Sequence, residues 1–260
     1  MPGTILVTGA TGTLGRPLVN RLLADGADVR VMSRRPRAAG DDRPYAWAVC
    51  DLATGTGLPQ ALRDVRTIVH CATHPRHDVT HTRRLLDAAS AAGAKPPHLV
   101  YISIVGIDAI PLGYYRRKLA AEQLIEGSGL PWTTLRATQF HDLVYSVTQA
   151  QRRLPVVLAP AGVRFQPIEV TEVAERLAEL AQSAPAGRVP EMGGPESRSW
   201  REFAQAAMRA EGWRRPVLSP RLPGKLARAF RDGANLTPDH AVGTVTFDTY
   251  LARRTTPPHP

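Results

Sequence analysis

Short apolar runs rich in β-branched residues alternate with amphipathic segments from Thr4 to about Ala137. Such runs are typical of buried strands, whereas apolar residues that recur with a period of about 3.6 are typical of helices. The short connections leave right-handed crossovers into one twisted parallel sheet as the economical topology. The predicted strands are Thr4–Thr8, Val29–Ser33, Ala46–Cys50, Thr67–Cys71, Leu99–Ser103 and Trp132–Arg136.

Three helices are predicted between these strands. The first, Leu14–Ala24, has its apolar residues on one face and is followed by Gly26, which is a common C-terminal stop. The second runs from Val79 to Ala92, and the third begins after Tyr114 and ends at Gly127. Alternating strands and helices predict an α/β fold of the Rossmann type, with a doubly wound parallel sheet covered on both faces.

Prolines interrupt the chain every few residues beyond about Gln151. The clearest helices there are Val170–Ala181 and Trp200–Ala210, and Ser199 with Glu202 has the spacing of a capping box before the second of them. We therefore expect a sheet domain over residues 1–153 and a smaller α-rich cap over residues 154–260 that binds substrate and is partly packed on the sheet.

The chain is basic, with 33 Lys+Arg against 23 Asp+Glu and a net charge of +10. Lysine occurs only at Lys95, Lys118 and Lys225, so the positive charge is mostly arginine scattered through every segment. A nucleic-acid partner is not expected from this distribution, although such a field favours a polyanionic ligand such as a phosphorylated cofactor.

The two cysteines, Cys50 and Cys71, stand inside apolar runs, where buried thiols are expected rather than a disulfide. The sequence has no apolar run of about 18 residues, the length that spans a membrane. The N-terminus enters a strand without the pattern of a signal peptide. We therefore expect a cytoplasmic protein with no membrane segment.

A glycine-rich turn links the first strand to the first helix, in the order Thr8-Gly9-Ala10-Thr11-Gly12-Thr13-Leu14-Gly15. Glycines permit positive φ and a close approach of the backbone, and the helix N-terminus offers free N–H groups to a pyrophosphate. In this strand–turn–helix context the motif predicts dinucleotide binding rather than merely a tight turn.

The second strand ends where NAD-binding sites usually carry a carboxylate for the ribose 2′-hydroxyl. Here Arg34 stands 19 residues beyond Gly15, between Ser33 and Arg35. A hydroxyl and two guanidiniums suit a 2′-phosphate, so NADP(H) is favoured and NAD(H) remains open. Asp51 ends the third strand and is expected either at the adenine edge or as a turn cap.

With these features the sequence resembles the atypical short-chain dehydrogenase/reductase superfamily, in its NmrA-like, NAD(P)H-binding branch. The resemblance covers nearly the whole chain. It rests on the loop Thr8–Gly15, the pair Asp51-Leu52, the strand Tyr101-Ile102-Ser103, the helix from Tyr114 with Lys118 and Glu122, the segment Ser128–Arg136 and the turn Gln166-Pro167-Ile168.

The resemblance implies a Tyr-x-x-x-Lys pair on one helix, and Tyr114 with Lys118 has that spacing. Lys118 would hold the nicotinamide ribose, and Tyr114 would give a proton to a carbonyl oxygen. Alternatively, Lys118 forms an i,i+4 ion pair with Glu122, and Tyr114 and Tyr115 form an aromatic helix edge. Members that reduce ketones usually carry a serine or threonine just beyond the fifth strand, whereas here Ser103 is followed by Ile104.

The remaining site candidates follow the ends of strands, where open α/β sheets bind ligands. The predicted cofactor-binding residues are Gly9, Thr11, Gly12, Thr13, Leu14, Gly15, Ser33, Arg34, Arg35, Asp51, Leu52, Cys71, Ala72, Thr73, Ser103 and Lys118. The predicted substrate-pocket residues are His74, Val105, Tyr115, Gln139 and Phe140, with His141 beside them.

Histidines and a cysteine gather around the fourth strand at His70, Cys71, His74, His77 and His81. Imidazole and thiolate are zinc ligands, but His70 and Cys71 point to opposite sides of a strand. We therefore expect no metal and interpret the group as part of a cofactor loop and a solvated helix start.

The sequence thus predicts an NADPH-dependent oxidoreductase that transfers a hydride to a carbonyl or quinone-like small molecule. The alternative is a non-catalytic NAD(P)-sensing regulatory protein of the NmrA type, although a sensor has no need of a proton donor such as Tyr114. Whether the chain forms a homodimer remains open.

Overall fold

The computed structural model describes residues 3–93 and 95–255. These residues fall into two compact units that interleave along the chain. The first, here called the sheet unit, holds residues up to 103 together with 113–136 and 170–190. The second unit holds residues 104–112, 137–169 and those from 191 onward. The division of the chain at residue 153 stays a prediction.

A seven-stranded sheet forms the centre of the sheet unit, in the order β3-β2-β1-β4-β5-β6-β9. Its described pairs are parallel, and Thr8 of β1 lies beside Met32 of β2 and His70 of β4. Because β2 and β4 flank β1, the strand order reverses between β1 and β4, which is where such sheets bind ligands. The strands are β1 (Thr4–Thr8), β2 (Val29–Ser33), β3 (Ala46–Val49), β4 (Val65–His70), β5 (His98–Ile104), β6 (Trp132–Ala137) and β9 (Gly187–Arg188).

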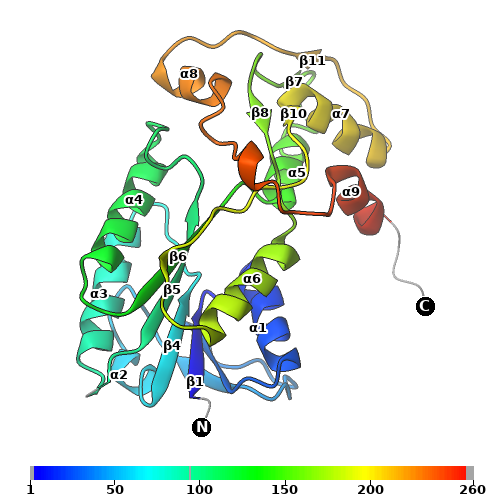
Figure 1. Cartoon of the computed structure of the whole chain (residues 1–260). Helices are drawn as coiled ribbons and strands as arrows, with labels where there is room; N and C mark the ends of the chain where they lie inside the picture. The colour runs from blue at the N-terminus through cyan, green and yellow to red at the C-terminus, as the bar shows by residue number, and fades with distance from the viewer. Residues whose placement is uncertain (1–2, 94, 256–260) are drawn as a thin grey trace. The chain divides into compact units, whose positions relative to one another are not determined.

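Helices cover both faces of this sheet (Figure 1). On one face lie α2 (Leu58–Ala61), α3 (Asp78–Ser90) and α4 (Gly113–Glu126), which pack with Leu6, Ile68 and Leu99 of the strands into one apolar core. On the other face α1 (Gly15–Ala24) packs against α6 (Val170–Gln182). The doubly wound α/β fold predicted from the sequence is therefore confirmed.

Helix α6 belongs to the sheet unit, although its proline-rich surroundings led us to expect it in the cap. Val173 and Leu177 of α6 are fully buried, as are Leu18 and Leu22 of α1. Burial of each such side chain stabilises the fold by about 1.5–3 kcal/mol, so the apolar stripe rather than the neighbouring prolines determines where α6 packs.

Among the described residues, the second unit holds α5 (His141–Gln149), α7 (Trp200–Ala210), α8 (Lys225–Arg231) and α9 (Phe247–Thr255), a 3₁₀ turn at Pro238–His240 and four short strands. Strands β7 (Val157–Leu158) and β11 (Val217–Leu218) pair in parallel, and β8 (Arg164–Phe165) pairs antiparallel with β10 (Arg198–Ser199). Phe203 of α7 and Phe247 of α9 are fully buried in its core.

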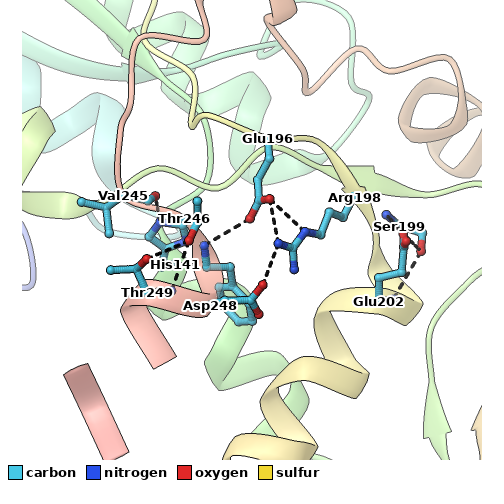
Figure 2. A network of polar contacts seen from close by, with 10 residues as sticks. His141, Glu196, Arg198, Ser199, Glu202, Val245, Thr246, Asp248 and Thr249 are labelled. Atoms are coloured by element: carbon cyan, nitrogen blue, oxygen red, sulfur yellow. Dashed lines mark hydrogen bonds and ion pairs between the residues drawn. The ribbon is translucent and has the colours of Figure 1, made fainter. Parts of the chain in front are cut away.

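Polar contacts tie α7 and α9 to the segments before them (Figure 2). Arg198 bridges Glu196 and Asp248, each at 2.7 Å. Ser199 and Glu202 form the capping box predicted from their spacing. His141, a predicted pocket neighbour, is fully buried and its Nε2 lies 3.0 Å from the carbonyl oxygen of Val245.

Candidate functional site

The glycine loop lies between the end of β1 and the start of α1, as the sequence predicts. Gly9 has a φ of +65°, and a Cβ atom there would lie 2.7 Å from the amide nitrogen of Ala72. A Cβ on Gly15 would lie 2.2 Å from the carbonyl oxygen of Gly9. Only glycine fits at either position. Gly9 therefore packs against the backbone of the segment after β4, and Gly15 packs against Gly9.

The start of α1 has backbone donors to offer. Leu14 is its N-cap and provides no side-chain cap. Among the residues that the structure describes, the amides of Thr13, Leu14 and Gly15 have no backbone acceptor. A helix N-terminus with free N–H groups and a partial positive charge suits a pyrophosphate, so the residues present fit the diphosphate of a dinucleotide.

Two arginines follow the end of β2, the strand that pairs with β1. The side chains of Arg34 and Arg35 are exposed, and none of the described residues forms a hydrogen bond or ion pair with either guanidinium. Ser33 Oγ accepts a hydrogen bond from the amide of Arg35 at 3.2 Å, which shapes this turn. Free guanidiniums beside the glycine loop suit a ribose 2′-phosphate.

Asp51 lies at the end of β3 and makes a local turn. Its Oδ1 accepts a hydrogen bond from the amide of Ala53 at 2.9 Å, as in the turn-cap alternative. Leu52 beside it is buried in the core. A contact of Asp51 with an adenine stays a prediction.

Tyr114 in the first turn of α4 meets the end of β4. Its hydroxyl lies 3.1 Å from Thr73 Oγ1, so two residues predicted separately are brought together. Thr73 is exposed and Tyr114 is half-buried, whereas Tyr115 is buried. Burial raises the pKa of Tyr114, the hydrogen bond with Thr73 lowers it, and the charge of Asp78 raises it, with a net rise that keeps the phenol protonated.

Lys118 is buried one helical turn after Tyr114, with only 4% of its surface exposed. Its Nζ donates to the carbonyl oxygen of Ile102 at 3.0 Å and lies 4.3 Å from the centre of the Tyr101 ring. Burial lowers the pKa of Lys118, and the charge of Asp78 opposes that shift. The Nζ of Lys118 is 3.9 Å from Asp78 Oδ2, so its ion-pair partner is Asp78 and not Glu122, the partner in the alternative interpretation.

Asp78, the first residue of α3, lies beside Lys118 and was not among the residues predicted for the site. Its Oδ1 accepts a hydrogen bond from the amide of His74 at 3.0 Å, and its Oδ2 is buried with only the charge of Lys118 beside it among the described residues. An acidic residue four positions after His74 and just before a helix is a local signal of this turn. Its partnership with Lys118 is a long-range contact without such a signal.

Ser103 is held by α4. Its hydroxyl donates to Glu122 Oε2 at 2.6 Å, and both residues are buried. The same carboxylate group binds Arg136 and Arg188, each at 2.8 Å. These contacts give Ser103 a structural partner, so its assignment to the cofactor site stays a prediction with a competing role.

The histidines after β4 form two groups. His70 is buried, with Nδ1 2.7 Å from Thr8 Oγ1 and Nε2 3.2 Å from Thr82 Oγ1. The rings of His74, His77 and His81 lie 4.8–6.1 Å apart. Among the described residues, no group of three or more His, Cys, Asp or Glu side chains is arranged to hold a metal ion.

Both thiols are free, as expected. Cys50 is buried, and the half-buried Cys71 follows β4 with its amide 3.3 Å from the carbonyl oxygen of Thr8. Burial raises the pKa of Cys71 to about 12, which favours the protonated thiol at neutral pH. Ala72 donates its amide to Thr8 Oγ1 at 3.1 Å, which ties the end of β4 to the glycine loop.

The predicted pocket residues divide between the two units. His74 and Tyr115 belong to the sheet unit, whereas Val105, Gln139 and Phe140 belong to the second unit. Gln139 is buried, and its Nε2 has no hydrogen-bond partner among the described residues. The grouping of these residues into one pocket stays a prediction.

A family of NAD(P)H-binding proteins matches residues 9–184 of the chain. The chain is 33% identical over 216 residues to a (4-alkanoyl-5-oxo-2,5-dihydrofuran-3-yl)methyl phosphate reductase of Streptomyces griseus, covering 80% of this chain and 74% of that protein. It is 32% identical over 152 residues to a photosystem II assembly factor of Cyanophora paradoxa, covering 53% of this chain and 46% of that protein.

Among solved structures, a NADPH-dependent quinone oxidoreductase from Escherichia coli, complexed with NADPH, superposes with a TM-score of 0.83 at 19% identity. The superposition covers 97% of this chain and 100% of that one, which establishes the shared fold. Within residues 3–93 and 95–255, no helix has both the length and the apolar character needed to cross a bilayer.

The glycine loop, the fold and the family match agree with one another. The chain therefore belongs to the family of NAD(P)H-binding proteins.

Proposed function

We propose that the protein is an NADPH-dependent oxidoreductase that transfers a hydride to a carbonyl or quinone-like small molecule. The observation that carries this proposal is the hydrogen bond between Tyr114 and Thr73 at the end of β4, with Lys118 one turn along the same helix. The reductase of Streptomyces griseus supports this proposal, because the compound in its name carries oxo and alkanoyl groups, which are carbonyl groups.

The preference for NADP(H) rests on charge. Arg34 and Arg35 stand exposed after β2, and a carboxylate at that position would repel a 2′-phosphate. Glycines at positions 9 and 15 let the loop fold closely against the backbone of Ala72 and on itself, and the amides of Thr13, Leu14 and Gly15 at the start of α1 are then available to the diphosphate. When bound, the reduced nicotinamide supplies the hydride.

Tyr114 serves as the proton donor. The substrate carbon gains a C–H bond as its carbonyl π pair moves to oxygen, and the phenol of Tyr114 then gives its proton to that oxygen. Its raised pKa means that the phenol holds this proton at neutral pH. Thr73 is exposed and hydrogen-bonded to Tyr114, so its hydroxyl is placed to return a proton from solvent.

Lys118 supplies a fixed positive charge beneath this site. Its Nζ is held by the carbonyl oxygen of Ile102, the Tyr101 ring and Asp78, so it stays in place without a ligand. A buried cation on the same helix face as Tyr114 stabilises the phenolate left after proton transfer. Burial lowers the pKa of Lys118, and the charge of Asp78 opposes that lowering.

The test is turnover of NADPH with a panel of quinones and ketones, followed by nicotinamide absorbance. Replacement of Tyr114 by Phe should lower kcat about a hundredfold or more, since general acid catalysis contributes that much, while NADPH affinity is retained. Tyr145→Phe in the second unit removes a different phenol hydroxyl and should keep the wild-type kcat. An unchanged kcat in Tyr114→Phe would remove Tyr114 from the mechanism.

The photosystem II assembly factor among the relatives favours a second candidate, a non-catalytic NAD(P)-sensing regulatory protein. The same panel of quinones and ketones distinguishes a reductase from a sensor. A protein that binds NADPH but oxidises it with no compound of the panel is a sensor, and the reductase proposal then fails.

A further inference from the structure

A cavity of about 810 Å³ lies in the second unit where α5 and α7 end. Three of its lining residues are arginines, and their side chains are exposed, so the cavity faces solvent. None of the lining residues is acidic. The lining consists of Gln149, Ala150, Arg152, Arg153, Trp213 and Arg215.

Two N–H donors of the lining lack acceptors. Trp213 is only 9% exposed, and its Nε1 is buried without a hydrogen-bond partner in the part of the chain that the structure describes. The same holds for Nε2 of Gln149. A buried donor without an acceptor costs free energy, so two of them beside one cavity indicate that an acceptor belongs there.

The arginines of the lining have few polar partners. Over the described residues, the guanidiniums of Arg152 and Arg153 form no hydrogen bond or ion pair. Arg215 donates to the carbonyl oxygens of Leu154 at 3.3 Å and Arg214 at 2.8 Å, which leaves its charge without a counter-ion. Glu211, at the end of α7, accepts a hydrogen bond from the Tyr145 hydroxyl at 2.5 Å.

Arginines near helix C-termini have a simpler explanation, because they offset the negative end of a helix dipole. Two helix ends contribute about −1 in total, whereas the three guanidiniums contribute +3. The last carbonyls of α5 are also already bonded, with Ser146 accepting from the amide of Ala150 and Thr148 from that of Gln151. Within the lining itself a positive charge of about +2 is therefore left over, which favours an anionic ligand such as a phosphoryl group.

We propose that this cavity is a binding site for a phosphoryl dianion, separate from the dinucleotide site. Guanidiniums form paired hydrogen bonds with phosphate oxygens, and the N–H groups of Trp213 and Gln149 supply neutral donors behind them. The indole and the methyl group of Ala150 offer an apolar surface to an organic group attached to the phosphate. A phosphate monoester combines these features, and free phosphate shares the charged part.

The experiment is calorimetric titration of the full-length protein with inorganic phosphate and with phenyl phosphate. We expect both probes to bind and phenyl phosphate to bind more tightly, because its ring meets the apolar part of the lining. The double variant Arg152→Ser/Arg153→Ser should weaken both about tenfold or more, since charge-assisted hydrogen bonds are lost. Trp213→Phe removes one N–H donor and should weaken both to a lesser degree.

Two control variants make the result specific. Arg214→Ser removes a neighbouring exposed arginine that is outside the lining, and it should leave both affinities within about twofold, as expected for a screened surface charge. Arg34→Asp alters the predicted dinucleotide site and should leave them unchanged, whether or not the protein turns over NADPH. Loss of binding in Arg34→Asp would place the probe at the dinucleotide site and overturn the proposal.

Further outcomes would also overturn it. Absence of heat with both probes at millimolar concentration means that the cavity is no phosphate site. Equal weakening in Arg214→Ser and in the double variant means that only the general basic field attracts the probes. Tighter binding of a single-stranded oligonucleotide than of phenyl phosphate means that the arginines belong to a nucleic-acid surface.

Discussion

At the scale of single residues, Gly9 has the least freedom in the glycine loop. It combines a positive φ with contact to the backbone of Ala72, so a side chain there meets two separate penalties. Gly26 after α1 has a similar φ of +74°, but no atom lies within 4 Å of the position that an added methyl group would take. A comparison of Gly9 with Gly26 therefore separates the free-energy cost of the left-handed backbone conformation from the cost of the steric contact.

Replacement of Gly9 by Ala should destabilise the protein by about 2–5 kcal/mol, with about 1–2 kcal/mol from the left-handed conformation and the rest from overpacking. Replacement of Gly26 by Ala should cost only the first part, about 1–2 kcal/mol. Urea unfolding of both variants measures the difference. Equal losses would mean that Ala72 moves freely away from the loop.

Single residues also mark the limit of sequence-based prediction at the site. The sequence singled out the glycine loop, Tyr114, Thr73 and Lys118, because each follows a strand end or has a known spacing, and the structure brings Tyr114 to Thr73 while their roles stay predictions. Asp78 was missed because its partner Lys118 is 40 positions away and nothing local links the two. The alternative pairing of Lys118 with Glu122 followed helix spacing, but Lys118 lies beside Asp78 and Glu122 beside Arg136.

At the scale of elements, one buried carboxylate links the three strands β5, β6 and β9 to helix α4. Glu122 of α4 is fully buried and binds Ser103 of β5, Arg136 of β6 and Arg188 of β9. This cluster holds the helix that carries Tyr114 and Lys118 against the sheet. Removal of one partner of a buried ion pair leaves the others buried without compensation.

Glu122→Gln should therefore destabilise the protein by about 3–5 kcal/mol. Glu126 provides the matched control, because it also binds Arg188, at 2.7 Å, but is 30% exposed. Glu126→Gln should cost about 1 kcal/mol or less. Chemical denaturation compares the two variants, and similar losses would contradict a structural role for the buried cluster.

Elements were predicted well where their apolar pattern was long. The six predicted strands and the helices α1, α3, α4, α6 and α7 were found within a few residues of their ends. Strand β9 has only two residues, which is too short for a periodic pattern, and glycine, its first residue, is not typical of strands. Helices α5, α8 and α9 were not predicted, and α8 has only seven residues and buries none of their side chains.

At the scale of the whole molecule, buried neutral histidines make stability depend on pH. Burial, with a smaller contribution from Lys118, lowers the pKa of His70 to about 4. Burial and then Arg66 lower the pKa of His98 to about 4. Between these values and the ordinary value of about 6.5 the unfolded chain binds more protons than the folded protein, so stability falls as the pH drops through this range.

The midpoint of urea unfolding should consequently decrease between about pH 6.5 and pH 4. His98→Gln keeps a donor and an acceptor near Thr133, which lies 2.9 Å from His98 Nε2, and should flatten part of this decrease. His240→Gln changes an exposed histidine and should keep the wild-type profile. A wild-type slope in His98→Gln would show that His98 is not protonated on unfolding in this range.

The sequence did not predict that the two units interleave along the chain. Contacts between residues that are far apart in the sequence leave no local pattern. Residues 170–190 return to the sheet unit after a long passage through the second unit. A sequence boundary drawn where prolines begin marks a change in composition, whereas compact units follow the burial of apolar stripes such as that of α6.

The central claim is that the glycine loop and Arg34 together hold a phosphorylated dinucleotide, and calorimetric titration with NADPH and NADH tests it most directly. Wild-type protein should bind NADPH about tenfold or more tightly than NADH, and Arg34→Asp should weaken NADPH while sparing NADH. No heat with either nucleotide, or equal weakening of both in Arg34→Asp, would contradict the account.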